Sequence, residues 1–468
     1  MQLHCTYYFN ICVAIINKEN MQYKISILDH LKFTPTFEQN RALNEMSNFV
    51  KEGNTNDFLI LSGSAGTGKT SITTALIGYL NTCAISYNIA APTGRAARIL
   101  GRKSQTLNST IHSLIYDPIV NQKTGVITFK LKKNIVKDYT VFIIDEASMI
   151  SSKTTYDEKS LFKSNNSLLS DLITFVKEGN QKNKLIFLGD RNQLPPVNEL
   201  ESKALCKNFL INNYSLKGVS YNLTEVKRQN NDSIILRNAN NVRVGIENNL
   251  KYVKMENIEI QNLSSACNNY IHSYKNDPDD SVISIGATHR MNNMFNNIVR
   301  ERIYGTSPNI VEENDLLLIS KTWSRNGVKL YSGDHVTVEE VDMEKMQTVA
   351  DLKFVPVKLK SKNLKNEEII IEDFLMLDSI TRPKGLELEQ EKRLYHERFK
   401  ENKIFRNSMN PSDDKYVGAI RANYGHSITC NKAQGGEWDT VFINSFFMPT
   451  LRYQYTAITR AKNSLILY

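Results

Sequence analysis

The feature that most constrains the fold is an eight-residue segment, Gly63-Ser64-Ala65-Gly66-Thr67-Gly68-Lys69-Thr70, which matches the pattern G-x-x-x-x-G-K-[ST]. It follows the apolar run 58–62, which predicts a buried strand, and it precedes a helical pattern over 69–80. In this context the glycines let backbone N–H groups turn inward around an anion, and the helix N-terminus adds positive potential. The segment therefore predicts a phosphate-binding loop at the carboxyl end of a strand.

Short apolar runs alternate with helical stretches beyond this loop, as in βαβ units on a parallel sheet. Further strands are expected at 88–91, 141–144 and 185–188, each ending in a polar or Gly-rich turn. In open α/β sheets ligands gather at the carboxyl ends of the strands. These turns are therefore where functional residues are expected.

The composition is that of an ordinary globular protein of several folded units, with 468 residues, 41% of them hydrophobic and 23% charged. The net charge of +9 fits a polyanionic partner but does not require one. The six cysteines are scattered without a C-x-x-C pair, which predicts reduced thiols and a cytoplasmic location rather than a zinc site or a disulfide framework. No apolar run approaches the length of a membrane span.

Residues 1–32 are expected to be an N-terminal extension. Tyr7 to Ile16 has the apolar character of a short signal segment, but no Lys or Arg precedes it. Met21 is an alternative start of the chain. The sequence leaves both alternatives open.

The run Ile143-Ile144-Asp145-Glu146 predicts the second half of the phosphate site. An apolar strand ending in two carboxylates can place Asp145 beside Mg²⁺, where the hydroxyl of Thr70 is the other protein ligand. Glu146 can then polarise a water molecule, and Lys69 can reach the β- and γ-phosphates. The alternative for the acidic pair is a strand end that faces solvent. Together the two segments predict an ATP–Mg²⁺ site.

An ordered series of motifs resembles superfamily 1 helicases of the RecD/Dda branch. In chain order these are Ala91–Ala97 (motif Ia), Thr110–His112 (Ib), Asp145–Ser148 (II), Leu188–Val197 (III), Leu223–Gln229 (IV), Ile428–Trp438 (V) and Tyr455–Ala461 (VI). Phe37-Glu38-Gln39 is similar to the adenine-reading element upstream of the loop. The resemblance runs from about residue 37 to the last motif.

The resemblance implies an α/β fold of two RecA-like P-loop NTPase domains with parallel sheets and ATP between them. Lys69, Glu146, Gln193, Arg228 and Arg460 would be catalytic, the two arginines as fingers on the γ-phosphate. The nucleotide would also contact Gln39, the loop residues 63–70, Gln434 and Glu437. The alternative for either arginine is an ordinary surface ion pair.

The single-strand track would run along motifs Ia, Ib and V, with Thr93, His112, Thr429 and Asn431 as contacts to the backbone. Their alternative interpretation is that of ordinary turn and cap residues. This branch often carries His where Asn431 stands, so the strength of that contact is open.

The resemblance also implies two insertions. Asn121 to Leu131 reads as a β-hairpin within 114–132, which would be the strand-separating pin. Residues 315–415 hold a β-rich stretch with turn signals at Asn326-Gly327 and Ser332-Gly333-Asp334, expected as a small Src-homology-3-like β-barrel, and then a charged helix over 384–406. The first domain is expected at 33–230 and the second at 231–314 and 416–468.

The predicted function is an ATP-dependent DNA helicase that moves 5′→3′ on single-stranded DNA and opens duplex junctions, the direction being implied by the resemblance alone. An RNA or hybrid translocase remains open, because a groove that tracks the backbone does not exclude a 2′-hydroxyl. A non-motor, ATP-gated subunit of a recombination or conjugation complex is the alternative from another class. A nuclease fusion is not supported, since no D…E-x-K cluster lies outside these motifs.

Overall fold

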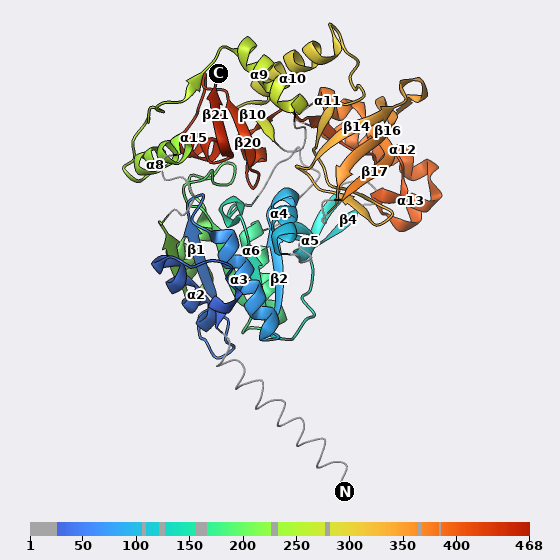
Figure 1. The fold of residues 1–468 in the computed structure, drawn as a ribbon. Coiled ribbons are helices and arrows are strands. Elements are labelled where there is room, and N and C mark those ends of the chain that lie inside the picture. Colours follow the sequence, from blue (N-terminus) through green and yellow to red (C-terminus); the bar gives the residue numbers. More distant parts are fainter. Residues whose placement is uncertain are drawn as a thin grey trace.

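The computed structural model describes residues 26–104, 109–120, 127–154, 166–225, 233–276, 281–363, 367–382 and 385–468. They form two α/β units and an inserted β-rich unit, which lie at the bottom, the top and the right of Figure 1. The N-terminal residues Tyr7 to Ile16 and Met21 lie outside the described ranges. In the described part of the chain no helix combines the length and the apolar character needed to cross a membrane.

The first unit, residues 26–225, is built on a six-stranded parallel sheet in the order β3-β2-β6-β7-β1-β8. Its strands are β1 (Phe58–Gly63), β2 (Ser86–Ala91), β3 (Ser109–Thr110), β6 (Thr140–Ile144), β7 (Lys184–Gly189) and β8 (Gly218–Leu223). Its helices are η1 (Ile27–His30), α2 (Phe37–Phe49), α3 (Lys69–Thr82), α4 (Gly94–Ser104), α5 (Ile111–Ile115), η2 (Ala147–Met149), α6 (Leu168–Gly179), η3 (Lys203–Leu205) and α7 (Lys207–Tyr214).

Helices cover both faces of this sheet, because successive side chains of a strand point to opposite faces. Leu59 and Leu61 of β1 pack in one core with α2 and α3, whereas Phe58 and Ile60 pack in another with α5 and α6. The first core also contains Ile27 of η1, which is 1% exposed. The first unit therefore begins before residue 33, inside the segment that we expected to be an extension.

The second unit, residues 233–304 and 427–468, has a five-stranded parallel sheet in the order β19-β10-β20-β21-β9. Its strands are β9 (Glu259–Ile260), β10 (Val282–Gly286), β19 (Ser427–Thr429), β20 (Trp438–Ile443) and β21 (Ala461–Leu467). Its helices are α8 (Ile234–Glu247), α9 (Leu263–Asn276), α10 (His289–Tyr304), α14 (Cys430–Ala433) and α15 (Leu451–Ile458). Helices α8 and α15 pack on one face, and α9 and α10 on the other.

The inserted unit, residues 311–424, is an antiparallel sheet in the order β15-β16-β14-β11-β18, with β17 on β16 and a separate hairpin β12-β13. Its strands are β11 (Leu316–Ile319), β12 (Trp323–Arg325), β13 (Val328–Leu330), β14 (His335–Val341), β15 (Gln347–Val349), β16 (Leu352–Lys362), β17 (Glu368–Met376) and β18 (Ala422–Tyr424). Its helices are η4 (Met343–Lys345), α11 (Leu377–Thr381), α12 (Leu388–Glu401), α13 (Lys403–Ser408) and η5 (Pro411–Asp413).

The inserted unit differs from the sequence prediction in two places. Strand β18, which we expected in the second domain, pairs with β11 and completes the inserted sheet. The charged segment forms two helices, because the side chain of Asn402 accepts hydrogen bonds from the backbone of Ile404 and Phe405 and starts α13. The turn at Asn326-Gly327 is confirmed: both residues have positive φ, as a two-residue hairpin requires.

A second small hairpin lies in the first unit, where β4 (Tyr116–Val120) pairs antiparallel with β5 (Ile127–Leu131). Its first strand precedes the expected start at Asn121, so the paired arms are longer than the sequence pattern indicated. The tip, residues 121–126, lies outside the described residues. Phe129 packs on His112 and Tyr116, with ring centroids 6.1 and 5.7 Å apart, and joins the hairpin base to α5.

Candidate nucleotide and single-strand sites

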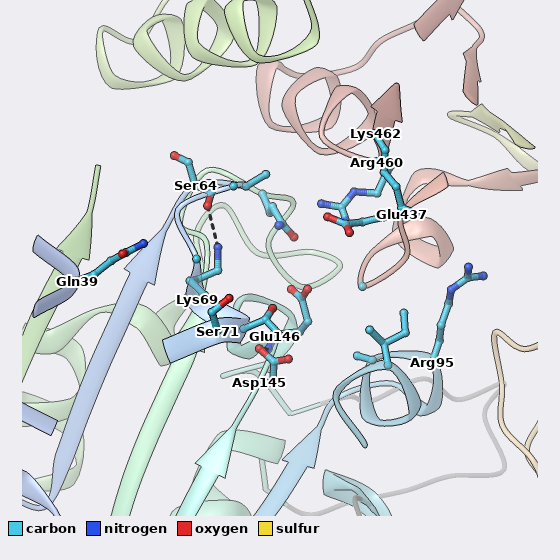
Figure 2. Close-up of a pocket in the computed structure, with 18 of the residues that line it drawn as sticks. Gln39, Ser64, Lys69, Ser71, Arg95, Asp145, Glu146, Glu437, Arg460 and Lys462 are labelled. Atoms are coloured by element: carbon cyan, nitrogen blue, oxygen red, sulfur yellow. Dashed lines mark hydrogen bonds between the residues drawn. The ribbon is translucent and has the colours of Figure 1, made fainter. Parts of the chain in front are cut away.

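A cavity of about 870 Å³ opens between the two α/β units. Figure 2 shows Lys69, Asp145 and Glu146 on one side of it and Glu437, Arg460 and Lys462 on the other. The expected site residues that line the cavity are Gln39, Ser64, Ala65, Gly66, Gly68, Lys69, Thr70, Asp145, Glu146, Gln193, Glu437 and Arg460. The sequence motifs therefore converge on one space, although they come from opposite ends of the chain.

The loop at 63–70 has the backbone form that its glycines predict. Gly66 and Gly68 adopt φ of 83° and 85°, and a Cβ on Gly68 would lie 2.6 Å from Nε2 of Gln39. The N-cap residue of α3, Gly68, has no side chain that could cap the helix, which suits its first-turn N–H groups to bind an anion. Lys69 Nζ donates to the carbonyls of Gly63 and Ser64, the latter at 3.0 Å, which holds the ammonium at the loop (Figure 2).

Gln39 lies against the phosphate loop. Its Nε2 donates to the carbonyl oxygen of Thr67 at 2.9 Å, and its Oε1 accepts from the backbone of Thr36 at 3.0 Å in a capping box. The side chain is 2% exposed. Gln39 is therefore fixed at one end of the cavity, beside Phe33 and Thr34, which the sequence motifs did not indicate. Thr67 and Gly63 shape the loop but do not line the cavity.

Two carboxylates stand at the end of β6. The backbone N–H of Glu146 donates to Oδ1 of Asp145 at 2.9 Å, and Glu146 has a φ of 49°, a left-handed conformation that is costly outside glycine. Desolvation, and next the charge of Asp145, raise the pKa of Glu146 to about 7. A raised carboxyl pKa beside a second carboxylate is what a general base near a cation site requires.

The residues fit Mg²⁺ as expected from the sequence. Thr70 and Asp145 both line the cavity with Lys69, and oxygen ligands of this kind are what Mg²⁺ takes alongside water and phosphate. A nearby divalent charge would also favour the ionised form of Glu146, whose pKa is raised by burial and by the adjacent Asp145. The donor set is that of a nucleotide-bound metal rather than a closed protein cage.

Arg460 faces these carboxylates from the second unit. It is 4% exposed, and its guanidinium donates to the carbonyls of Thr456 and Gly436 and to the Thr459 hydroxyl, at 2.9–3.1 Å. Three of its five N–H donors are thus used to hold it, and the others remain for the cavity. Its charge also lowers the pKa of Glu146, which places it within electrostatic reach of the proposed base. Arg228 lies outside the described residues.

The loop after β7 connects the cavity to the second unit. Gln193 is 5% exposed and lines the cavity, and its Oε1 is buried without a hydrogen-bond partner among the described residues. The next residue, Leu194, accepts from Nε2 of Gln434 at 3.0 Å and donates its N–H to Thr456 Oγ1 at 2.8 Å. Gln434 was expected at the nucleotide but does not line this cavity. Its side chain instead holds the loop through the carbonyl of Leu194.

A second pocket, of about 340 Å³, lies where the two α/β units meet the inserted unit. Thr93, His112 and Asn431 line it, so three of the four expected single-strand contacts are brought together. Thr429 is not among its lining residues; it is half-buried at the start of α14. Gln434 lines this second pocket, which places one amide side chain between the two sites.

The inserted unit supplies a part of this pocket that the sequence motifs did not indicate, namely Thr322, Ser332 and Gly333. Helix α4 explains how that unit comes so close: a Cβ on Gly94 would lie 2.1 Å from Cβ of Tyr331. Arg98 of the same helix forms an ion pair with Asp334 at 2.5 Å. The Gly333 turn signal was visible in the sequence, but nothing local indicated what it faces.

Arg95 was also missed as a site residue. It lines both pockets, lies 4.3 Å from the ring centroid of Trp438, and donates to His335 Nδ1 at 3.0 Å. Lys462, two residues after Arg460, adds a further cation to the nucleotide cavity. Only their positions in the sequence could have indicated Arg95 and Lys462 as site residues, since each stands within or just after a motif.

Comparison with known proteins gives one family match in the first unit and one in the C-terminal part of the chain. Residues 47–199 match the AAA domain family, and residues 424–468 match the UvrD-like helicase C-terminal domain. The ATP-dependent DNA helicase dda of Enterobacteria phage T4 is 26% identical over 343 residues, which cover 71% of this chain and 71% of that protein. The ATP-dependent RecD2 DNA helicase of Deinococcus radiodurans is 30% identical over 140 residues, 30% of this chain and 16% of that protein.

Among solved structures, a Pif1 helicase from Bacteroides in complex with ADP-AlF3 and ssDNA aligns over 93% of this chain and 92% of that one, with a TM-score of 0.49 and 15% identity. The two family matches flank the inserted unit, and together they include Lys69, Asp145, Glu146, Gln193 and Arg460. These family matches and relatives support a superfamily 1 DNA helicase of the RecD/Dda type, which is an ATP-dependent enzyme.

Proposed function

We propose that this chain couples ATP hydrolysis to 5′→3′ movement along single-stranded DNA and to the opening of duplexes at junctions. One observation carries the proposal: the loop that lines the nucleotide cavity with Gln193 is bonded through Leu194 to Gln434 and Thr456 of the second unit. Gln434 in turn lines the pocket of Thr93 and Asn431. A change at the nucleotide thus has a short bonded path to the strand.

The catalytic roles follow from the positions of the side chains. Bound ATP supplies the phosphoanhydride that is cleaved, and Mg²⁺ offsets the negative charge on its phosphates. Thr70 and Asp145 would hold the metal, and Lys69 would leave the loop carbonyls to donate to phosphate oxygens. Glu146 would accept a proton from the attacking water at its carboxylate, as its elevated pKa near 7 favours.

The second unit contributes from across the cavity. Arg460 would donate its remaining N–H groups to the transferred phosphoryl group, and a finger of this kind is worth about 10³–10⁵ in rate in related systems. Because Arg460 is fixed by Thr456, Thr459 and Gly436, it moves with the second unit as a rigid part. Closure of the two units would therefore control hydrolysis.

Gln193 is suited to report the state of the nucleotide. Its buried Oε1 lacks a partner among the described residues, and a buried unpaired acceptor is costly. This oxygen would gain a hydrogen-bond donor when the attacking water is in place beside the nucleotide. That gain would favour the closed arrangement before hydrolysis, and its loss would release it afterwards.

The proposal also assigns residues that bind the DNA backbone and an element that opens the duplex. Thr93, His112 and Asn431 suit contact with a sugar-phosphate backbone, and Thr429 would act from the start of α14. The β4–β5 hairpin would be the pin that parts the duplex, because it projects from the base formed by Tyr116 and Phe129, next to His112.

The test is ATP turnover measured without nucleic acid, with single-stranded DNA and with RNA of the same sequence. Strong stimulation by DNA and little by RNA is expected. Equal stimulation by RNA would favour an RNA or hybrid translocase. No stimulation by either polymer would favour an ATP-gated subunit and would contradict a motor.

A further inference from the structure

A third pocket, of about 290 Å³, lies at the junction of the inserted unit and α14. Four cationic side chains, Lys321, Arg382, Arg421 and Lys432, line it together with one carboxylate, Glu391. The cations come from four separate segments: Lys321 follows β11, Arg382 follows α11, Arg421 precedes β18, and Lys432 lies in α14. None of these residues belongs to the roles assigned above.

Cations outnumber carboxylates in this pocket, although Arg382 also forms an ion pair with Asp378 at 3.4 Å. Arg421 is 8% exposed and forms a two-pronged ion pair with Glu391, whose second contact is 2.8 Å, yet its Nε is buried without a hydrogen-bond partner among the described residues. The neighbouring Arg421, followed by desolvation, lowers the pKa of Lys321 to about 8. Gathering like charges in a desolvated place is unfavourable unless an anion joins them.

The pocket and the proposed strand site share one lining residue. Lys432 lines both this pocket and the pocket of Thr93, His112 and Asn431. Desolvation lowers its pKa, and its Nζ is oriented by a hydrogen bond of 3.1 Å to Oδ1 of Asn423. An anion that occupies the cationic pocket would therefore lie beside the polymer in the strand pocket.

We infer that the pocket of Lys321, Arg382, Arg421 and Lys432 binds a phosphate group of the single strand next to those held by Thr93 and Asn431. Guanidinium and ammonium groups together are the usual partners of phosphate oxygens. The inference rests on the proposed function, since it extends the strand beyond the pocket that the helicase motifs line. It makes the inserted unit a part of the grip through Lys321 and Arg382.

Lys321→Gln and Arg382→Gln test the inference, because both side chains are only half-buried or exposed and neither joins a core. The affinity for a short oligodeoxythymidylate is measured over a range of salt concentrations. Each variant should show a log–log slope less steep than the parent chain by about 0.7, the value for one lost single-strand phosphate contact. ATP turnover without DNA should be unchanged.

Lys345→Gln is the matched control. Lys345 is an exposed lysine of the same inserted unit that pairs only with neighbouring Asp342 among the described contacts, at 2.7 Å. Its removal should leave the salt slope as it is. If Lys345→Gln changed the salt slope as much as Lys321→Gln does, the effect would come from the overall positive charge of the unit and not from a specific contact. That result would overturn the inference.

A set of oligonucleotides, each with one methylphosphonate, locates the contact. Among the neutralised positions that weaken binding of the parent chain, one should have no effect on Lys321→Gln, as a double-mutant cycle requires. Unchanged slopes in both variants would overturn the inference. A second result would also overturn it: inorganic phosphate raises the melting temperature of the parent chain but not of the variants, while the salt slopes of DNA binding are equal in all of them. The pocket would then bind a free anion and not the DNA.

Failure of the two proposals is distinguishable. If the parent chain binds DNA and is stimulated by it while the variants keep its slope, only the pocket assignment is wrong. If the parent chain shows no DNA binding, the proposed function itself is wrong.

Discussion

The hydroxyl of Tyr455 donates to Oδ2 of Asp190 at 2.7 Å, and this bond joins the second α/β unit to the first. Both residues are at most 1% exposed. Asp190 opens the loop that carries Gln193, and its other oxygen accepts from the backbone of Asn192 at 2.9 Å. The bond therefore fixes the nucleotide-facing loop to the helix that leads to Arg460.

Tyr455→Phe should weaken the joint between the units. It leaves a buried carboxylate oxygen without its donor, which costs about 1.5–3 kcal/mol of folding stability for a bond to a charged group. Because Arg460 follows on the same segment, kcat of the DNA-stimulated ATPase should fall roughly tenfold. Chemical denaturation and steady-state kinetics measure the two effects.

Tyr453→Phe is the control for that substitution. Tyr453 lies on the same helix and is 3% exposed, but its hydroxyl has no hydrogen-bond partner among the described residues. Its loss should not reduce stability or turnover. Equal losses in the two variants would show that the Asp190 contact has no special role.

Glu146→Gln should separate nucleotide binding from turnover. The amide keeps the size of the side chain but cannot accept the proton of the attacking water, so ATP turnover should drop by about 10²–10⁴. ATP affinity, measured by a fluorescent analogue, should be little changed, whereas Lys69→Ala should weaken both binding and turnover. Near-normal turnover in Glu146→Gln would show that another group is the base.

The same residue predicts a pH dependence of stability. Because burial raises the pKa of Glu146 from 4.5 to about 7, the folded protein binds this proton more tightly than the unfolded chain. Its contribution to stability is therefore present below pH 4.5 and is lost as the pH rises to 7. Melting of Glu146→Gln and of the parent, both without nucleotide, should give a higher melting temperature for the variant at pH 8.

The difference in melting temperature should shrink towards zero as the pH is lowered below 4.5, where the parent carboxyl becomes neutral in the folded and in the unfolded state. A constant difference across this range would mean that the substitution acts through packing rather than through charge.

Shortening the β4–β5 hairpin should separate movement from unwinding. Replacement of residues 121–126 by a two-residue Asn-Gly turn leaves Phe129 and its contacts with His112 and Tyr116 in place. DNA-stimulated ATP turnover and single-strand translocation should stay close to those of the parent, while duplex unwinding drops sharply. Stopped-flow assays of the two activities, run on the same preparation, make the comparison.

If both activities fell together, with a lower melting temperature, the hairpin would merely cover an edge of the first unit. A variant with the original loop length but a Ser/Gly sequence in place of residues 121–126 provides the control. It keeps the length of the loop while removing the native side chains of these residues.

Local chemistry made much of the site predictable. A strand, a glycine turn and a helix start at Lys69 follow from residues within one short segment, and β1 and α3 begin where the sequence indicates. The convergence of Lys69, Asp145 and Glu146 follows because parallel strands end at one edge of a sheet. These contacts depend on the order of elements more than on fine packing.

Contacts between distant segments were not predictable in this way. Gln434 stands in a motif that suggested the nucleotide, but its amide is used by the carbonyl of Leu194. The pairing of β18 with β11 and the contact of Gly94 with Tyr331 join residues far apart in the sequence. Such contacts depend on how whole units pack, and no local pattern specifies that packing.

The position of the inserted unit has a consequence for synthesis on the ribosome. Strand β10 emerges early, but its partners β19 and β20 follow only after the whole insertion has been translated. Chains grow at about 5–20 residues per second and their N-terminal domains fold first. The first unit can thus complete its phosphate loop while β10 still has two unpaired edges, which would leave an apolar strand for chaperones to cover until β19 and β20 arrive.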